Sequence, residues 1–270
     1  QCLFLFYIHN MIYKELKIIF LSDMHLVHKD DFLGINTFNS FSAVVDNIVV
    51  NHSDADCVVF GGDLVQDQSI ASFNFFESEI KRIKSPKLFS RGNHDISDKF
   101  FINLQEDDFV NSTNSDWEVL FLNTYSKGNI FGEVKESDLD LLIKKSILLQ
   151  GKHLLIYMHH NLFLTGSPWL DMHITRNKDK TLKLLSKMRN LKLVVNGHVH
   201  QETRNQYKGI DFISSPSTSI QFTSNEKKFK LDNRNPGYLE IKLQQEGRWE
   251  VLCHRVEGDF GSPKINPKSY

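Results

Sequence analysis

Arg91-Gly92-Asn93-His94-Asp95 is the stretch around which the rest of this chain is organised. It directly follows a short apolar run, residues 87–89, whose composition predicts a β-strand. A glycine at the end of a strand allows a tight turn, and the polar side chains of such a turn lie beyond the edge of the sheet, where α/β proteins bind ligands. Taken alone, the stretch also fits an ordinary polar turn, so its meaning depends on the rest of the chain.

Four other polar blocks each follow an apolar run that predicts a strand. The blocks are Asp23-Met24-His25, Gly61-Gly62-Asp63, His159-His160 and Gly197-His198-Val199-His200, after predicted strands at 16–21, 57–60, 154–158 and 191–195. Any one of these blocks alone is more often a structural turn than a ligand site. Because the carboxyl ends of parallel strands meet at one edge of a sheet, five such blocks together indicate a single shared site.

The segments between the predicted strands have the apolar spacing of helices. We expect helices at residues 36–51, 69–84, 136–149 and 178–189, the third with Ser137 as its N-cap and Gly151 just past its end. Residues 161–176 are predicted to be irregular, and short strands are expected at 117–122, 210–213, 237–243 and 249–253. The alternation of strands and helices predicts an α/β fold, and up to residue 89 it predicts parallel strands with right-handed crossovers.

The composition is typical of a single globular domain without a strong charge. Hydrophobic residues make up 40% of the 270 residues and charged residues 24%, and the formal net charge is -1. No basic field is available for a polynucleotide backbone, so a nucleic-acid polymer is disfavoured as a partner. We expect one domain over residues 11–256 and a loosely ordered tail at 257–270, which is rich in Gly, Pro and Ser.

The N-terminal end is strongly apolar over residues 1–8, but this run is too short to cross a bilayer and lacks the features of a signal peptide. Because the first methionine is Met11, we expect residues 1–10 to be a non-native or disordered leader; a short edge strand or a membrane-surface anchor is the alternative. No other stretch reaches transmembrane length. The cysteines, Cys2, Cys57 and Cys253, are scattered, which is typical of reduced thiols in a cytoplasmic protein.

The polar side chains that follow the strands are oxygen and nitrogen donors without any thiolate. They are Asp23, His25, Asp63, Asn93, His94, His159, His198 and His200. This donor set suits Mn, Fe or Zn better than an all-oxygen Ca or Mg site. Even with one donor set aside, the rest exceed the positions of one tetrahedral ion, so we predict two metal ions with Asp63 as the carboxylate that bridges them.

The remaining histidines lie outside the five polar blocks. They are His9, His28, His52, His153, His173 and His254. His28 and His173 are the two that could approach the site, and surface or packing roles are expected for the other four.

The five blocks resemble the motifs of the calcineurin-like metallophosphoesterases over residues 16–256. The matching residues form Asp-x-His, Gly-Asp-x-x-x-Asp (Gly62, Asp63, Asp67), Gly-Asn-His-Asp, His159 and Gly-His-x-His. The resemblance implies a four-layer αββα sandwich, in which helices flank two packed mixed sheets. It also implies one metal held by Asp23, His25, Asp63 and His200, and a second held by Asp63, Asn93, His159 and His198. His94 would lie outside both metal shells and face the phosphate, with Asp95 orienting it.

A narrower resemblance is to the class III cyclic AMP phosphodiesterases of bacteria, the CpdA type. It rests on Leu33-Gly34-Ile35-Asn36-Thr37, Trp169-Leu170-Asp171, His173, Arg176-Asn177, residues 216–222, Leu231-Asp232 and Pro236-Gly237-Tyr238. The chain departs from that pattern at Asn123-Thr124, where Asp-Ser is expected, and at Asn161-Leu162, where a proline is usual nearby. Neither departure touches a metal ligand, so they bear on substrate preference and not on metal chemistry.

This narrower resemblance implies hydrolysis of 3′,5′-cyclic AMP to 5′-AMP. A hydroxide that bridges the two metals would attack phosphorus, and His94 would protonate the departing ribose 3′-oxygen as general acid. Asn93, His94 and His200 would contact the phosphate.

Contacts to the rest of the substrate are predicted from resemblance and position. Trp169 and Phe222 would form an aromatic platform for adenine, with ordinary packing as the alternative. Arg176 would contact phosphate or pair with Asp171.

Two other functions stay open at the level of sequence. A related metallophosphoesterase could act on a 2′,3′-cyclic nucleotide, a nucleotide-sugar or a lipid pyrophosphate, because such enzymes share all five motifs. A non-catalytic metal-binding scaffold is the second alternative, although the chain keeps every ligand and His94. The sequence leaves the metal identity open and allows a homodimer.

Overall fold

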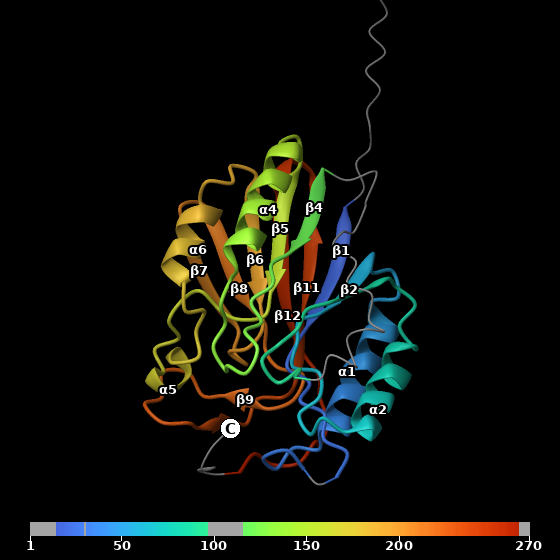
Figure 1. The fold of residues 1–270 in the computed structure, drawn as a ribbon. Coiled ribbons are helices and arrows are strands. Elements are labelled where there is room, and N and C mark those ends of the chain that lie inside the picture. The colour runs from blue at the N-terminus through green and yellow to red at the C-terminus, as the bar shows by residue number, and fades with distance from the viewer. Residues whose placement is uncertain (1–14, 30, 97–115, 265–270) are drawn as a thin grey trace, which may run out of the picture.

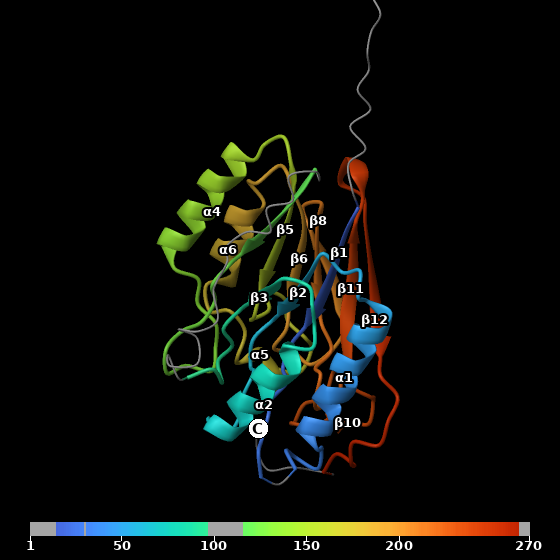
Figure 2. The same cartoon turned by 90° about the vertical axis from the view of Figure 1, so that its right-hand side faces the viewer.

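Two five-stranded mixed β-sheets pack face to face, and helices cover both outer faces (Figure 1 and Figure 2). The computed structural model describes residues 15–29, 31–96 and 116–264. The predicted leader at residues 1–10 and the end of the predicted tail, 265–270, lie outside the described residues. The four-layer αββα sandwich is confirmed.

The first sheet holds strands β12, β11, β1, β2 and β3 in that order. Their bounds are β1 Leu16–Leu21, β2 Cys57–Phe60, β3 Lys87–Phe89, β11 Gly237–Leu243 and β12 Trp249–Arg255. Strands β1, β2 and β3 run parallel, whereas β11 pairs antiparallel with both β1 and β12. The parallel strands predicted for the segment up to residue 89 are therefore confirmed.

The second sheet holds strands β4, β5, β6, β8 and β7 in that order. Their bounds are β4 Trp117–Phe121, β5 His153–Met158, β6 Leu191–Asn196, β7 Thr203–Tyr207 and β8 Ile210–Ser214. The sequence analysis missed β7, because this edge strand is polar and pairs only with β8. It also missed β9 (Gln221–Phe222) and β10 (Leu231–Asp232), whose two-residue lengths leave no periodic pattern to read.

Alternating side chains divide the interior into three apolar layers. In β1, Ile18 and Phe20 face the second sheet, while Ile19 and Leu21 face the helices of the first. Strand β5 alternates in the same way, with Tyr157 between the sheets. Because both faces of these strands are buried, they read as continuous apolar runs.

Helices α1 (Thr37–Asn51) and α2 (Ile70–Ile80) cover the first sheet, and α4 (Glu136–Leu148) and α6 (Lys178–Leu185) cover the second. The side chains of Asn36 and Ser69 accept hydrogen bonds from the first turns of α1 and α2. Such N-caps are each worth about 1 kcal/mol. Among the described residues, we find no helix with the length and apolarity that a bilayer crossing requires.

Several helix boundaries differ from the prediction. The N-cap of α4 is Lys135 and not Ser137, since acidic side chains stabilise a first turn that begins earlier. Helix α2 ends at Ile80, short of residue 84, because the chain turns there and buries Ile83. Helix α6 ends at Leu185, short of residue 189. The segment 161–176 is irregular apart from the one-turn helix α5 (Pro168–Asp171).

The described part of the C-terminal tail contacts the loop before α1. Phe260 is buried in the apolar layer of α1, and its carbonyl accepts from the backbone N–H of Asn36 at 2.8 Å. The backbone N–H of Lys264 donates to Leu33 O at 2.9 Å, and Gly261 forms a β-bridge with Ile35. These contacts hold residues 260–264 against the loop before α1, and the predicted looseness of the tail as a whole stays a prediction.

Candidate metal centre

The five polar blocks meet at the ends of strands from both sheets. The backbone N–H of Asp23 donates to Gly62 O, and that of His25 donates to Asp63 O, each at 3.0 Å. The backbone N–H of His198 donates to the Asp23 carboxylate at 3.0 Å. These bonds join the first two blocks of the first sheet to each other and to the last block of the second sheet.

Five of the predicted ligands have a left-handed backbone conformation. They are Asp23, His25, Asp63, His198 and His200, with φ between 45° and 68°. Residues with side chains adopt this region rarely, at a cost of order 1–3 kcal/mol each where the conformation is strained. Backbone strain of this kind clusters at ligand sites, so its concentration on predicted ligands supports a common binding role.

Two glycines allow the blocks to approach one another closely. A Cβ atom at Gly92 would lie 2.1 Å from Asp63 Oδ1, and one at Gly197 would lie 2.0 Å from Ser22 Oγ. Both distances are far below van der Waals contact, so any side chain at either position would push the blocks apart. Gly92 is thus required for the approach to the carboxylate as well as for the turn.

His25 and His200 face each other beside Asp23. Their Nδ1 atoms donate to Gln66 Oε1 at 2.7 Å and to Ile220 O at 2.8 Å, so in the neutral rings the lone pairs are on Nε2. The two Nε2 atoms are 3.2 Å apart, and Asp23 Oδ1 lies 3.4 Å from that of His200. Lone pairs and a carboxylate in this arrangement repel one another unless a cation lies among them, so the group fits a metal ion.

Asp63 lies between two imidazoles. Its Oδ2 atom is 3.7 Å from His25 Nε2 and 3.3 Å from His159 Nε2, while Oδ1 accepts from the backbone N–H of His94 at 2.8 Å. His159 Nδ1 donates to Gly61 O at 2.7 Å, which turns Nε2 toward the carboxylate. A carboxylate with a histidine on either side has the arrangement that a bridging ligand requires.

Four predicted ligands have buried polar atoms that lack a hydrogen-bond partner among the described residues. These atoms are both ring nitrogens of His198, the side-chain oxygen of Asn93, Asp63 Oδ2 and His159 Nε2. Only 2% of His198 is exposed. A buried polar group without a partner costs about 1–3 kcal/mol, and a metal ion would remove that cost. His198 and Asn93 therefore fit the second predicted ion.

The charges of the site favour a cation. Burial opposes the charge of the Asp63 carboxylate, but the nearby rings of His159, His94 and His25 together outweigh it and hold the pKa of Asp63 well below its usual range. Burial likewise opposes the charge of His159, yet Asp63 raises the pKa of that ring to about 9. Burial lowers the pKa of His25 to about 3, so this ring is a neutral ligand. The site thus attracts positive charge at Asp63 and offers neutral imidazole beside it.

His94 and Asn93 are the half-buried members of a site whose other predicted ligands are buried. The His94 ring lies edge-on to that of His25, with the ring centroids 5.0 Å apart. Burial lowers the pKa of His94. A ring nitrogen of His94 also lies within 4.8 Å of ligand atoms of His25 and Asp63, so the role of His94 outside the metal shell remains a prediction.

Asp95 holds the backbone and not the ring of His94. Its carboxylate accepts from the backbone N–H groups of Gly92 at 2.8 Å, Asp63 at 2.7 Å and Leu64 at 2.8 Å. Burial and the nearby Asp63 carboxylate raise the pKa of Asp95 to about 7, against the effect of these N–H donors. Asp95 therefore ties two blocks together, which corrects the predicted role of orienting His94.

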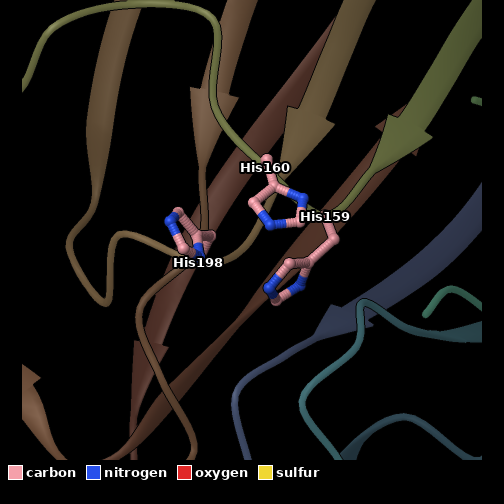
Figure 3. A group of neighbouring side chains, drawn as sticks. All are labelled: His159, His160 and His198. Carbon is pink, nitrogen blue, oxygen red and sulfur yellow. The ribbon is translucent and has the colours of Figure 1, made fainter. Parts of the chain in front are cut away.

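His160 lies beside His159 and His198, and Figure 3 shows the three rings grouped where β5 and β6 end. Its ring and that of His198 have centroids 4.6 Å apart. However, His160 Nε2 donates to Ile130 O at 3.2 Å, and Nδ1 accepts from Thr124 Oγ1 at 2.9 Å. Both ring nitrogens are thus occupied by protein groups, which gives His160 a packing role against His198.

The two side chains of the predicted aromatic platform have different surroundings in the structure. Phe222 is fully buried and stacks on the His200 ring, with centroids 4.0 Å apart and planes inclined by 5°. It therefore supports a predicted ligand, and the prediction that it contacts adenine is wrong. Trp169 is partly buried and packs edge-on against Phe222 at 5.0 Å.

Arg176 is exposed, and its guanidinium lies 3.6 Å from the centroid of the Phe131 ring. Asp171 instead accepts from the backbone N–H and hydroxyl of Thr165. The alternative pairing of Arg176 with Asp171 is therefore not formed.

Of the two histidines outside the polar blocks that could approach the site, His173 comes near it and His28 does not. The His173 ring centroid is 6.4 Å from that of His198. The exposed His28 packs against Phe38 instead.

The sequence analysis missed the groups that fix the imidazole rings. Gln66 is the side chain that holds His25. It lies inside the Gly-Asp-x-x-x-Asp block, so its position in this motif could have pointed to it. The carbonyls of Gly61 and Ile220 hold His159 and His200. No side-chain pattern can disclose a backbone carbonyl, so these two partners required the structure.

Comparison with known proteins identifies the family of this chain. A family model described as calcineurin-like phosphoesterase matches residues 16–202. This chain therefore belongs to the calcineurin-like phosphoesterase family.

Curated relatives align over nearly the whole chain. The 3′,5′-cyclic adenosine monophosphate phosphodiesterase CpdA of Haemophilus influenzae is 30% identical over 261 residues, which cover 94% of this chain and 95% of the relative. The CpdA protein of Escherichia coli K12 is 30% identical over 262 residues, which cover 95% of each.

Solved structures share the fold at low identity. A dimetal phosphatase from Danio rerio superposes with a TM-score of 0.66 at 13% identity, over 90% of this chain and 99% of that one. A purple acid phosphatase from yellow lupin also gives 0.66 at 13% identity, over 91% of this chain and 52% of its own.

Proposed function

We propose that this protein is a binuclear-metal phosphodiesterase that hydrolyses 3′,5′-cyclic AMP to 5′-AMP. The observation that carries the metal chemistry is the pair of Nε2 atoms, of His25 and His200, that face each other at 3.2 Å next to two buried carboxylates. The choice of substrate is supported by relatives that are aligned over about 95% of the chain and named for that activity.

One metal would be held by Asp23, His25, Asp63 and His200, and the other by Asp63, Asn93, His159 and His198. The donors allow Mn or Fe, with Zn as a further choice. When bound, two such ions lower the pKa of a water molecule and neutralise the charge of the phosphate.

His94 would supply the proton for the departing ribose 3′-oxygen. Two observations support this role: His94 is a half-buried residue in a site whose predicted histidine ligands are buried, and its ring lies next to that of His25. An imidazole titrates near neutral pH, so it can donate a proton to an alkoxide and recover it from water. Asp95 would keep the loop that carries His94 in place through the backbone of Gly92.

The phosphate would lie against Asn93, His94 and His200. Trp169 and Arg176 are retained as contacts to the rest of the nucleotide, because both keep some exposed surface. Phe222 would act indirectly by fixing the plane of the His200 ring.

Rates of the purified protein on three substrates test this proposal. We expect Mn²⁺-dependent turnover of 3′,5′-cyclic AMP that exceeds turnover of 2′,3′-cyclic AMP and of an aryl phosphodiester, and that a chelator abolishes. Preference for either other substrate would overturn the choice of substrate but keep the metal chemistry. Stoichiometric metal without turnover of any phosphoester would instead support a non-catalytic scaffold.

A further inference from the structure

A second group of metal-ligating side chains lies where the end of α1 meets strands β11 and β12. Its members are His52, Glu240 and His254, and each offers one ligand atom within 4.8 Å of the others. Figure 2 shows α1 alongside these two strands. The group shares no residue with the metal centre described above.

The three side chains come together on the helix-facing side of the first sheet. Leu239 and Ile241 point between the two sheets, so Glu240 between them points toward the helices. His254 pairs with Tyr238 across the ladder, and their rings stack with centroids 5.0 Å apart. His52 is the C-cap residue of α1. The group therefore joins a helix end to two strands.

The hydrogen bonds of Tyr238 determine which nitrogen of His52 carries a proton. The Tyr238 hydroxyl donates to Asn47 Oδ1 at 2.6 Å, so it must accept from His52 Nε2, which lies 2.7 Å away. In the neutral ring the lone pair is then on Nδ1. This atom is buried without a hydrogen-bond partner among the described residues, in a side chain that exposes only 6% of its surface.

An unpartnered lone pair at this depth indicates a ligand. It costs about 1–3 kcal/mol unless something bonds to it. Moreover, a histidine that donates one ring nitrogen to the protein and keeps the other free has the arrangement usual for metal-binding histidines.

Glu240 and His254 already share one contact that a metal could replace. His254 Nε2 lies 2.8 Å from Glu240 Oε2, while the other carboxylate oxygen has only long ion pairs, to Lys242 at 3.5 Å and to Lys17 at 3.7 Å. The lysines balance part of the carboxylate charge at the other oxygen, Oε1, while Oε2 lies beside the His254 ring. The side chain of His254 is 33% exposed, so an ion and a water molecule can reach the group from solvent.

We propose that His52, Glu240 and His254 form a third metal site, separate from the catalytic centre. Two imidazoles and one carboxylate suit Zn²⁺, with water as the fourth ligand. The ion would link the end of α1 to β11 and β12. Its role would be structural, since binding to ligands that come together only in the folded chain stabilises that chain.

The test counts zinc bound to the full-length protein after saturation and gel filtration. We compare the wild type with His254→Ala, which removes a partly exposed ligand, and with Glu240→Gln, which keeps the volume of the side chain. His153→Ala is the matched control, because His153 is a partly exposed histidine of similar accessibility outside the group.

Both ligand variants should bind one zinc ion fewer per chain than the wild type and the control. They should keep cyclic nucleotide turnover with Mn²⁺. Zinc should raise the Tm of both ligand variants by less than it raises the Tm of the control. Equal zinc content in all four proteins would overturn the proposal. Loss of turnover together with the zinc would also overturn it, since the substitution would then act through the catalytic centre or the fold.

Discussion

The two sheets contribute unlike halves of the proposed metal centre. The first sheet supplies both carboxylates, Asp23 and Asp63, whereas the second supplies only imidazoles, those of His159, His198 and His200. Attraction for cations is therefore concentrated on the first sheet, and the second sheet contributes nitrogen ligands. Loss of a central carboxylate should affect both ions, while loss of an imidazole should affect one.

The substitution with the largest expected effect on this division between the sheets is Asp63→Asn. The change removes the negative charge between His25 and His159 and should empty both metal positions. Because metal ions contribute several kcal/mol to such reactions, turnover should fall by about 10³-fold or more. Elemental analysis of the purified variant, alongside steady-state rates, measures both effects. A variant that keeps one tightly bound ion would show that Asp63 does not bridge.

His198→Ala tests the other half of the comparison. It removes one imidazole from the second sheet, so one ion per chain should remain while the second is lost. Turnover should fall by more than the ~100-fold typical of losing a group that only positions a ligand. The same elemental analysis applies, and His173→Ala is a neighbouring control that should keep both ions. Loss of both ions from the His198 variant would contradict the division between the sheets.

His94→Ala separates catalysis from metal binding. Turnover should drop by roughly 10²–10⁴-fold, the range that general acid catalysis supplies, with metal content unchanged. A substrate whose leaving group needs no proton, such as an activated aryl diester, should lose much less rate. If bound metal falls in parallel with turnover, His94 belongs to the metal shell.

Asp95→Asn tests how two polar blocks of the first sheet are held together. The amide keeps the shape of the carboxylate but brings an NH₂ group against backbone N–H donors of Gly92, Asp63 and Leu64. We expect a loss of about 1–3 kcal/mol of stability, measured as a lower Tm in thermal unfolding of the metal-free protein. An unchanged Tm would show that the carboxylate does not hold these two blocks together.

Gln66→Leu should have the smallest effect. Gln66 is the side chain that fixes His25, whereas His159 and His200 are fixed by backbone carbonyls that no substitution removes directly. Metal affinity should fall by about 10-fold, the lower end for a group that orients a ligand. Chelator competition measures this affinity. An unaltered affinity would mean that packing alone orients His25.

The sequence predicted much of the fold and of the site, for reasons that particular elements make clear. Strands β1, β2 and β5 are continuous apolar runs, since both faces are buried, and each ends in a polar block. By contrast, β7 is polar and exists only because β8 offers it an edge. The tail at 258–264 has no periodic pattern either, and it is ordered by backbone hydrogen bonds to the loop before α1.

From the sequence alone, the ligand types and their positions after strands were determined, because strand periodicity and turn chemistry are local properties of the chain. Only the tertiary structure decided which protein group each imidazole bonds to, that Phe222 supports His200, that Asp95 holds backbone, and that His52 lies beside Glu240 and His254. These depend on contacts between residues far apart in the chain, such as the 186 positions that separate His52 from Tyr238. Hydrogen-bond direction and burial arise from such contacts, and no local pattern contains them.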